Sequence, residues 1–107
     1  MRPAFTPLAE QDLEAIADYV AADNPVRALS FVRELRTQCQ RITLNPPGYR
    51  LRPELGDRIR SCAHGHQVIF FESNSDVVVI VRILHGARDI PAVFGADPEL
   101  PVRYAVL

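Results

Sequence analysis

Two stretches in the first half of the chain carry apolar residues at the three- and four-residue spacing of an amphipathic helix. The first begins at Thr6-Pro7 and the second at Asn24-Pro25. Such pairs favour a helix start, because the Thr or Asn side chain can accept a hydrogen bond from a free backbone amide of the first turn and Pro suits the first helical position. The two stripes consist of Ala9, Leu13, Ile16 and Val20, and of Ala28, Val32, Leu35, Cys39 and Ile42. The first helix should end near residue 22, and the second before Asn45-Pro46-Pro47-Gly48. Because only a short break separates them, we expect an antiparallel αα-hairpin.

After the double proline the pattern changes to that of strands. Short apolar segments at 59–63, 66–72 and 77–84 are separated by His64-Gly65, which can form a tight turn, and by the turn cluster Ser73-Asn74-Ser75-Asp76. These segments predict an antiparallel meander. The unbroken apolar run at the start of the last segment favours a central strand that is buried on both faces. Residues 2–5 are apolar enough to add a short strand to the same sheet.

Two adjacent helices followed by strands predict an α+β fold in the order β-α-α-β-β-β, with the αα-hairpin packed on one face of an antiparallel sheet. Asp89 or Pro91 should open a short terminal helix. Residues 95–107 contain Pro98 and Pro101 and show no clear period, so we treat them as a C-terminal extension.

The composition fits one ordinary globular domain. The chain has 107 residues, of which 48% are hydrophobic and 23% charged. We find no apolar run long enough to cross a bilayer and no signal-peptide core, and so expect a cytoplasmic protein. Cys62, His64 and His66 lack a fourth ligand and the spacing of a zinc finger, and there is no phosphate-cradling glycine loop. We therefore expect neither a metal nor a cofactor.

Charge is distributed unevenly along the chain although the net charge is only −1. Acidic residues dominate the first 24 positions, and arginines dominate positions 25–60. The chain contains no lysine. A basic middle between acidic ends suits docking onto an acidic protein or a phosphate backbone, whereas the low net charge gives no reason to expect direct sequence-specific binding of nucleic acid.

The segment His85-Gly86-Ala87-Arg88-Asp89 follows directly on the last predicted strand, where functional groups often gather. His85 could carry a proton and Arg88 could bind a phosphate. The structural alternative is that Gly86 forms the turn, Asp89 caps the next helix and Arg88 pairs with a carboxylate. The residue types alone favour this alternative.

Two further arginines are candidates for a basic groove across the sheet. Arg82 is a charge inside an apolar strand, so it must reach solvent or be paired, for example with an acid on a helix. Arg60 on the first meander strand could lie near it. We expect the loop 50–56, like the arginines of the second helix, to be a solvated surface.

The chain resembles the ParE branch of the RelE/ParE toxin superfamily over residues 3–94. The resemblance rests on Thr6 to Leu13, Ile16 to Val20 with Asp23-Asn24-Pro25, Arg52 to Gly56, Ile59-Arg60-Ser61, and above all Arg82 to Asp89. It implies the β-α-α-β-β-β fold reached above, a toxin domain over residues 1–94, and an extension over 95–107 on which the family is silent.

The resemblance also implies a function. ParE proteins are toxins of type II toxin–antitoxin systems, associated with plasmid stabilisation. A ParD-like antitoxin neutralises them in a hetero-oligomer, and they poison DNA gyrase without a chemical step of their own. Arg60, Arg82, His85 and Arg88 are then candidates for binding the target.

Two alternatives stay open. In the first, the chain is a RelE-like ribosome-dependent mRNA endonuclease with His85, Arg60 and Arg82 as catalytic residues. The lack of lysine, and of a tyrosine aligned with the C-terminal one of that branch, makes such a site poor. In the second, the chain is a degenerate binding module without toxicity.

Overall fold

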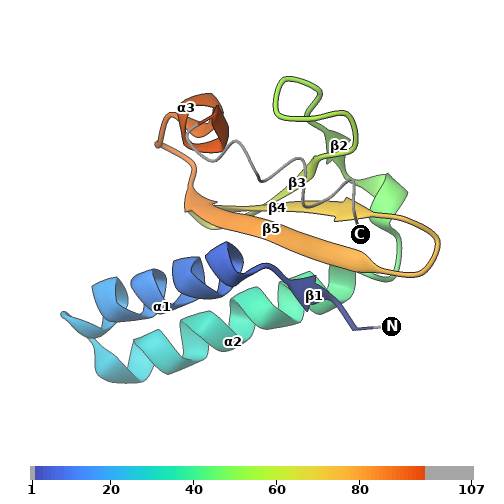
Figure 1. Cartoon of the computed structure of the whole chain (residues 1–107). Helices are drawn as coiled ribbons and strands as arrows, with labels where there is room; N and C mark the ends of the chain where they lie inside the picture. Colours follow the sequence, from blue (N-terminus) through green and yellow to red (C-terminus); the bar gives the residue numbers. More distant parts are fainter. Residues whose placement is uncertain (1, 96–107) are drawn as a thin grey trace.

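The computed structural model describes residues 2–95 and builds them into two helices, a five-stranded sheet and a short terminal helix (Figure 1). The C-terminal extension lies outside the described residues. In chain order the elements are β1 (Ala4–Phe5), α1 (Pro7–Ala21), α2 (Pro25–Ile42), a 3-10 turn (Pro46–Gly48), β2 (Arg50–Leu51), β3 (Arg60–His64), β4 (Gln67–Ser73), β5 (Val78–His85) and α3 (Ile90–Gly95).

The predicted helical hairpin is confirmed, and both of its helices begin as the sequence indicates. The Thr6 hydroxyl accepts a hydrogen bond from the Ala9 amide at 3.0 Å, and the Asn24 side chain accepts one from the Arg27 amide at 3.0 Å. A proline opens each helix. These contacts satisfy amides that have no partner within the helix.

The predicted meander is also confirmed, within a sheet of order β1-β5-β4-β3-β2. β3, β4 and β5 pair antiparallel, whereas β1 pairs parallel to β5, so that the sheet is mixed. The first hairpin turn lies at Gly65-His66, one residue later than expected, because His64 still pairs with Gln67 and Gly65 supplies a positive φ of 60°. β2 was missed: it falls in the segment that we interpreted as a loop, and only its pairing with β3 makes it a strand.

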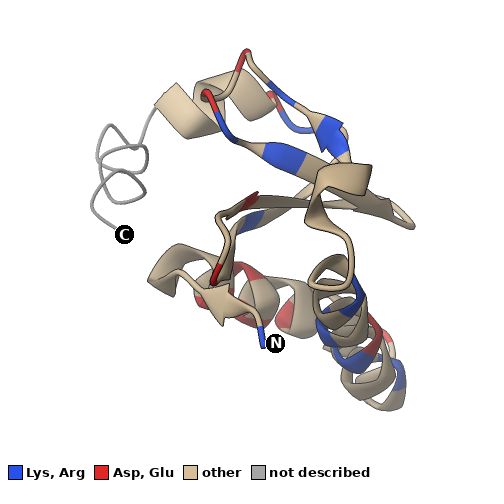
Figure 2. Ribbon diagram, turned by 90° about the vertical axis from the view of Figure 1, so that its right-hand side faces the viewer, with Lys and Arg blue, Asp and Glu red and all other residues tan. Residues whose placement is uncertain are grey.

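The sheet has an apolar core on each face, with the hairpin and α3 on opposite sides (Figure 2). Val78 and Ile80 belong to the core beneath the hairpin, and Val79 and Val81 to the core beneath α3. The prediction that this strand is buried on both faces is therefore confirmed. It lies between β1 and β4 as expected of a central strand, but β1 pairs with only Val79 and Ile80. β4 and β5 slip in register at Phe70 and Phe71.

The expectation that loop 50–56 is a solvated connection holds for its exposed residues Arg50, Leu51, Pro53 and Glu54 but was wrong for Leu55. Leu55 is only 8% exposed and belongs to the core beneath α3. The Arg52 guanidinium lies 5.5 Å from the centre of the Phe70 ring, while Phe94 of α3 meets the same ring edge-on, with 5.3 Å between ring centroids. The loop and α3 thus close the second face of the sheet together.

Candidate functional site

Arg82 is held by an acid on the first helix. Its Nε and Nη2 donate to the two carboxylate oxygens of Asp12 at 2.8 and 2.9 Å, and the two side chains are only 13% and 10% exposed. Of the two interpretations of Arg82, the structure therefore favours the buried ion pair.

The same carboxylate helps to close the edge of β5. β1 covers β5 only as far as Ile80. Beyond that point the Thr6 hydroxyl donates to the Val81 carbonyl at 2.7 Å, and Asp12 accepts from the Ile83 amide at 2.9 Å. Side chains thus satisfy edge groups that would otherwise be open to strand pairing.

Arg60 has a structural contact as well. Its Nη1 donates to the Tyr49 carbonyl at 2.8 Å and lies 3.4 Å from the Pro47 carbonyl, which ties the 3-10 turn to β3. The guanidinium is therefore committed in part to the backbone carbonyls of this turn.

The structure does not bring Arg60 and Arg82 together in one groove. Arg60 pairs with Phe71 on one side of β4, and Arg82 pairs with Phe70 on the other. Neighbouring residues of a strand point to opposite faces of the sheet, so the two arginines leave it on opposite faces. The pairing register of two strands is a long-range property that residue spacing does not reveal.

His85 lies exposed at the end of β5, where its ring stacks on that of His66 with 5.8 Å between centroids and 12° between planes. Its Nδ1 accepts a hydrogen bond from the Ala87 amide at 3.1 Å. A nitrogen that accepts carries no proton, so a neutral His85 in this arrangement presents Nε2–H to solvent. It can donate a hydrogen bond there.

In the rest of this turn, Gly86 and Asp89 have the structural roles that the sequence analysis gave as the alternative. The Gly86 amide donates to the His66 carbonyl at 2.8 Å, and the Asp89 side chain accepts from the Ala92 amide at 3.2 Å, capping α3. Arg88 is exposed, and within residues 2–95 it forms no ion pair. Of the four target-binding candidates that the sequence analysis selected, His85 and Arg88 are the two that lie exposed on the surface.

A groove of about 550 Å³ at the other end of the sheet was missed by the sequence analysis. It is lined by Thr43, Pro46, Pro47, Leu51, Asp57, Arg58, Arg60, Ser73, Asn74 and Ser75. Arg58 pairs with Glu72 at 3.2 Å, and burial raises the pKa of that carboxyl. With Asp57 and Glu72 beside Arg58 and Arg60, the opposite charges largely offset one another.

The part of the chain that the structure describes contains no group of three or more metal-ligating side chains. Cys39 and Cys62 are buried and unpaired with each other, and burial raises the pKa of Cys39 to about 12 and also raises that of Cys62. Such thiols are poor nucleophiles and poor metal ligands at neutral pH.

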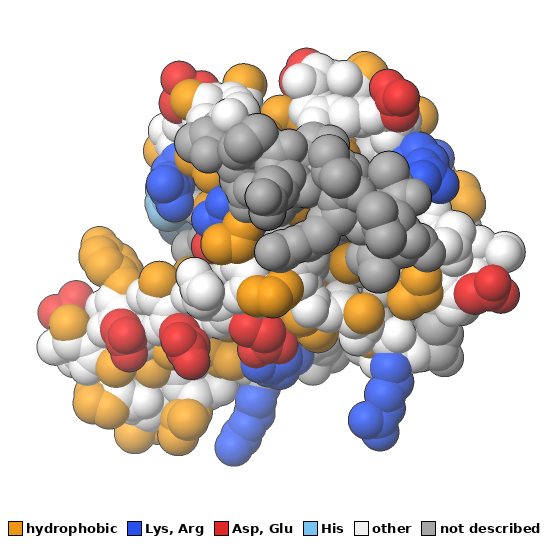
Figure 3. All heavy atoms as spheres, viewed as in Figure 1, with side chains coloured by type: hydrophobic (Ala, Val, Ile, Leu, Met, Phe, Trp, Pro, Cys, Tyr) orange, Lys and Arg blue, Asp and Glu red, His pale blue; other side chains and the backbone are white. Residues whose placement is uncertain are grey.

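Large apolar side chains are exposed at two places. Tyr19, Val26 and Leu29 lie toward the closed end of the helical hairpin, where hydrophobic side chains gather on the surface (Figure 3), and Leu44 and Leu51 lie near the groove. Val26 is 78% exposed and Leu29 65%.

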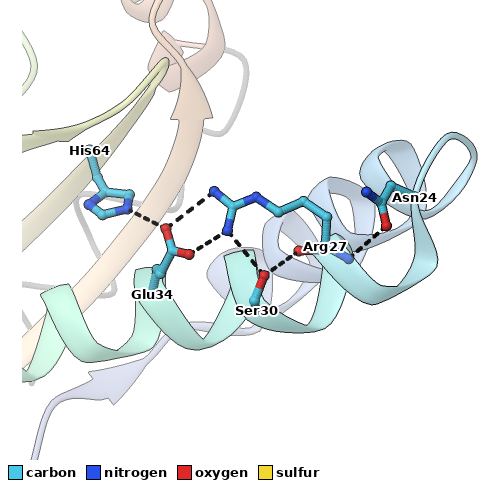
Figure 4. A network of polar contacts seen from close by, with 5 residues as sticks. All are labelled: Asn24, Arg27, Ser30, Glu34 and His64. Carbon is cyan, nitrogen blue, oxygen red and sulfur yellow. Dashed lines mark hydrogen bonds and ion pairs between the residues drawn. The ribbon is translucent and has the colours of Figure 1, made fainter.

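The four arginines of α2 are exposed, as expected, and two of them, Arg27 and Arg36, also form ion pairs. Arg27 binds Glu34 and the Ser30 hydroxyl, and Glu34 also lies 3.6 Å from Nε2 of His64 on β3 (Figure 4). The hydrogen bond from Arg27 lowers the pKa of Glu34. This network links α2 to β3 at the surface.

Comparison with known proteins identifies the family. The model of the "ParE toxin of type II toxin-antitoxin system, parDE" matches residues 4–90. This chain belongs to the ParE toxin family. The solved structure "Chromosomal ParDE TA system from P. aeruginosa" has a similar fold, with a TM-score of 0.69 and 23% identity over 79% of this chain and 95% of that one. A search of curated proteins found no match. Among residues 2–95, no helix is both long and apolar enough to cross a membrane.

Proposed function

We propose that this ParE toxin acts in the cytoplasm by binding DNA gyrase and that a ParD-like antitoxin neutralises it. Membership of the ParE family over residues 4–90 carries this proposal. The target and the antitoxin are what that membership implies for this chain.

The closed second face of the sheet supports a mechanism by binding rather than by catalysis. RNA cleavage needs an acid, a base and cations that converge on one phosphate. Here Arg82 is held by Asp12, Arg60 leaves the opposite face, and His85 presents a donor. Leu55, Ile90 and Phe94 pack over the face beneath α3.

Within this proposal, His85 and Arg88 contact the target. Both lie exposed on the turn between β5 and α3, and the hydrogen bond from Gly86 to His66 fixes the path of that turn. Arg60 and Arg82 act indirectly, by holding the 3-10 turn and the edge of β5.

The antitoxin needs an apolar surface on which a segment can order as it binds. The exposed Tyr19, Val26 and Leu29 offer such a surface on the hairpin. The toxin and antitoxin then form a hetero-oligomer, and covering these side chains should improve the solubility of the toxin.

Induced expression in a bacterium tests the proposal. We expect filamentation with a DNA-damage response, and rescue by the small open reading frame adjacent to the toxin gene. Purified toxin should increase gyrase-dependent cleavage of supercoiled plasmid. Arg88→Glu should abolish both effects, whereas the matched control Arg41→Glu, another exposed arginine, should keep them. Rapid translational arrest with cut mRNA would instead identify a nuclease, and normal growth a degenerate module.

A further inference from the structure

The helical hairpin presents two stripes of opposite character on the side away from the sheet. Exposed residues of α1 and its C-cap at helical spacing are Gln11, Glu14, Ala15, Asp18 and Ala22. The corresponding exposed residues of α2 are Val26, Leu29, Arg33 and Thr37. Both stripes lie opposite the buried residues of their own helix, so they form one surface with an acidic half and a basic, apolar half. Figure 2 shows the charged residues along the two helices.

The charges on these stripes are available for a partner. Within residues 2–95, neither Glu14 nor Asp18 nor Arg33 takes part in an ion pair. The contact of Arg36 with Glu10 at 3.0 Å shows how the two antiparallel helices are aligned. Counting four residues along each helix from that pair places Glu14 level with Val32, the neighbour of Arg33. A further four residues place Asp18 level with Ala28, the neighbour of Leu29.

We propose that two copies of the toxin associate through this surface into a symmetric four-helix bundle. A two-fold axis that lies between the two surfaces and runs along the helices places each α1 on α2 of the other copy. Such a rotation keeps the axial alignment, so that Arg33 of each copy meets Glu14 of the other. Leu29 then lies between the levels of Ala15 and Asp18 of the other copy, and Val26 lies near Ala22. The small alanine side chains let the helices approach closely.

The size of the surface sets the strength of this association. α2 has 18 residues, which at 1.5 Å per residue is about 27 Å, and two helices side by side are roughly 20 Å wide. Each copy therefore offers on the order of 500 Å², so that the total of about 1,000 Å² lies at the lower limit of specific interfaces. We expect a weak dimer that salt weakens, because each contact between Arg33 and Glu14 lies near solvent.

The inference concerns the isolated toxin and does not depend on gyrase as the target. It does overlap with the proposed antitoxin surface, since Val26 and Leu29 belong to both. An antitoxin seated there would separate the two copies, whereas the free toxin would cover part of its own apolar surface.

Sedimentation of the full-length chain, made by cell-free translation, tests the inference. We expect a monomer–dimer equilibrium that shifts toward monomer at high salt. Arg33→Glu and Glu14→Arg should each weaken the dimer at least tenfold, because like charges then face one another in both contacts. Arg41→Glu is the matched control on α2: counted from the same pair, it lies beyond the first residue of α1 and should leave the dimer unchanged.

Mixing the two single variants gives the decisive measurement. A copy with Glu at both positions and a copy with Arg at both positions complement one another in each contact, so the mixture should form a heterodimer although neither variant dimerises alone. Ion pairs within one chain cannot produce that result. A monomer at every concentration in low salt would overturn the proposal, as would a dimer insensitive to both reversals or a mixture that stays monomeric. Urea unfolding of each variant would verify that it is folded.

Discussion

Replacing Asp12 by alanine should destabilise the toxin more than replacing any other acid of α1. Asp12 makes three hydrogen bonds, two from Arg82 and one from the Ile83 amide. The other acids of α1, namely Glu10, Glu14 and Asp18, are exposed. Removing the Asp12 carboxylate leaves a guanidinium with little access to water and an amide at an uncovered strand edge.

The magnitude follows from burial. Removing one partner of a buried ion pair costs about 3–5 kcal/mol, because the remaining charge has lost its solvation and its partner. The Arg82 side chain is 13% exposed, so some solvation can return, and we expect a loss near the lower end, about 3 kcal/mol. The whole domain is stabilised by about 5–15 kcal/mol. One substitution would therefore remove a large part of its stability.

Urea unfolding followed by circular dichroism measures this loss. Asp18→Ala, on the same helix, is the control and should change the free energy of unfolding by less than about 0.5 kcal/mol. The double variant Asp12→Ala with Arg82→Met should recover part of the loss, since it leaves no unpaired charge. If Asp12→Ala were no less stable than Asp18→Ala, the argument that this pair holds α1 to β5 would be refuted.

Substitutions at Thr6 and Glu72 and chemical labelling of the two cysteines test other contacts. Thr6→Val removes both hydrogen bonds of the Thr6 hydroxyl and should lower the free energy of unfolding in urea by about 1–2 kcal/mol. Thr6→Ser keeps the hydroxyl and should be about as stable as the wild type. Equal stability of the two variants would contradict this. Cys39 and Cys62, whose pKa values burial raises, should react with iodoacetamide only after denaturation, as mass spectrometry would show; fast labelling of the folded protein would disprove their protection. Burial raises the pKa of Glu72 above its ordinary 4.5, so the folded state binds this proton more tightly than the unfolded chain does. The stability contributed by the protonated form is lost as the pH rises through the raised pKa, and Glu72→Gln should therefore gain on the wild type across that range; a difference that does not vary with pH would count against this.

The helices and the three long strands could be predicted because their signals are local. A stripe such as Ala28, Leu35 and Ile42 marks one face of a helix whatever it packs against, and Thr6 and Asn24 cap helices through amides three residues away. β2 could not be predicted in this way. Two residues make no recognisable period, and β3 is what makes them a strand.

In the candidate site, too, only the features with a local signal could be predicted. His85 and Arg88 were selected by their position at the end of a strong strand, which the chain order reveals, and they remain candidates. Asp89 was correctly expected to cap a helix. The partner of Arg82 could be anticipated only as some acid on a helix. The distance of 70 residues between Asp12 and Arg82 carries no local signal.

Residue order and side-chain chemistry thus determine the helices and the three long strands, the residues at which the two long helices begin, and the family to which the chain belongs. Only the packed molecule decides that α1 lies against the edge of β5, that Arg60 and Arg82 leave opposite faces, and that α3 covers the second face. The physical reason is that local hydrogen bonds and periodicity act over a few residues. The choice of a distant partner depends on the register in which strands pair and on how two apolar faces fit together.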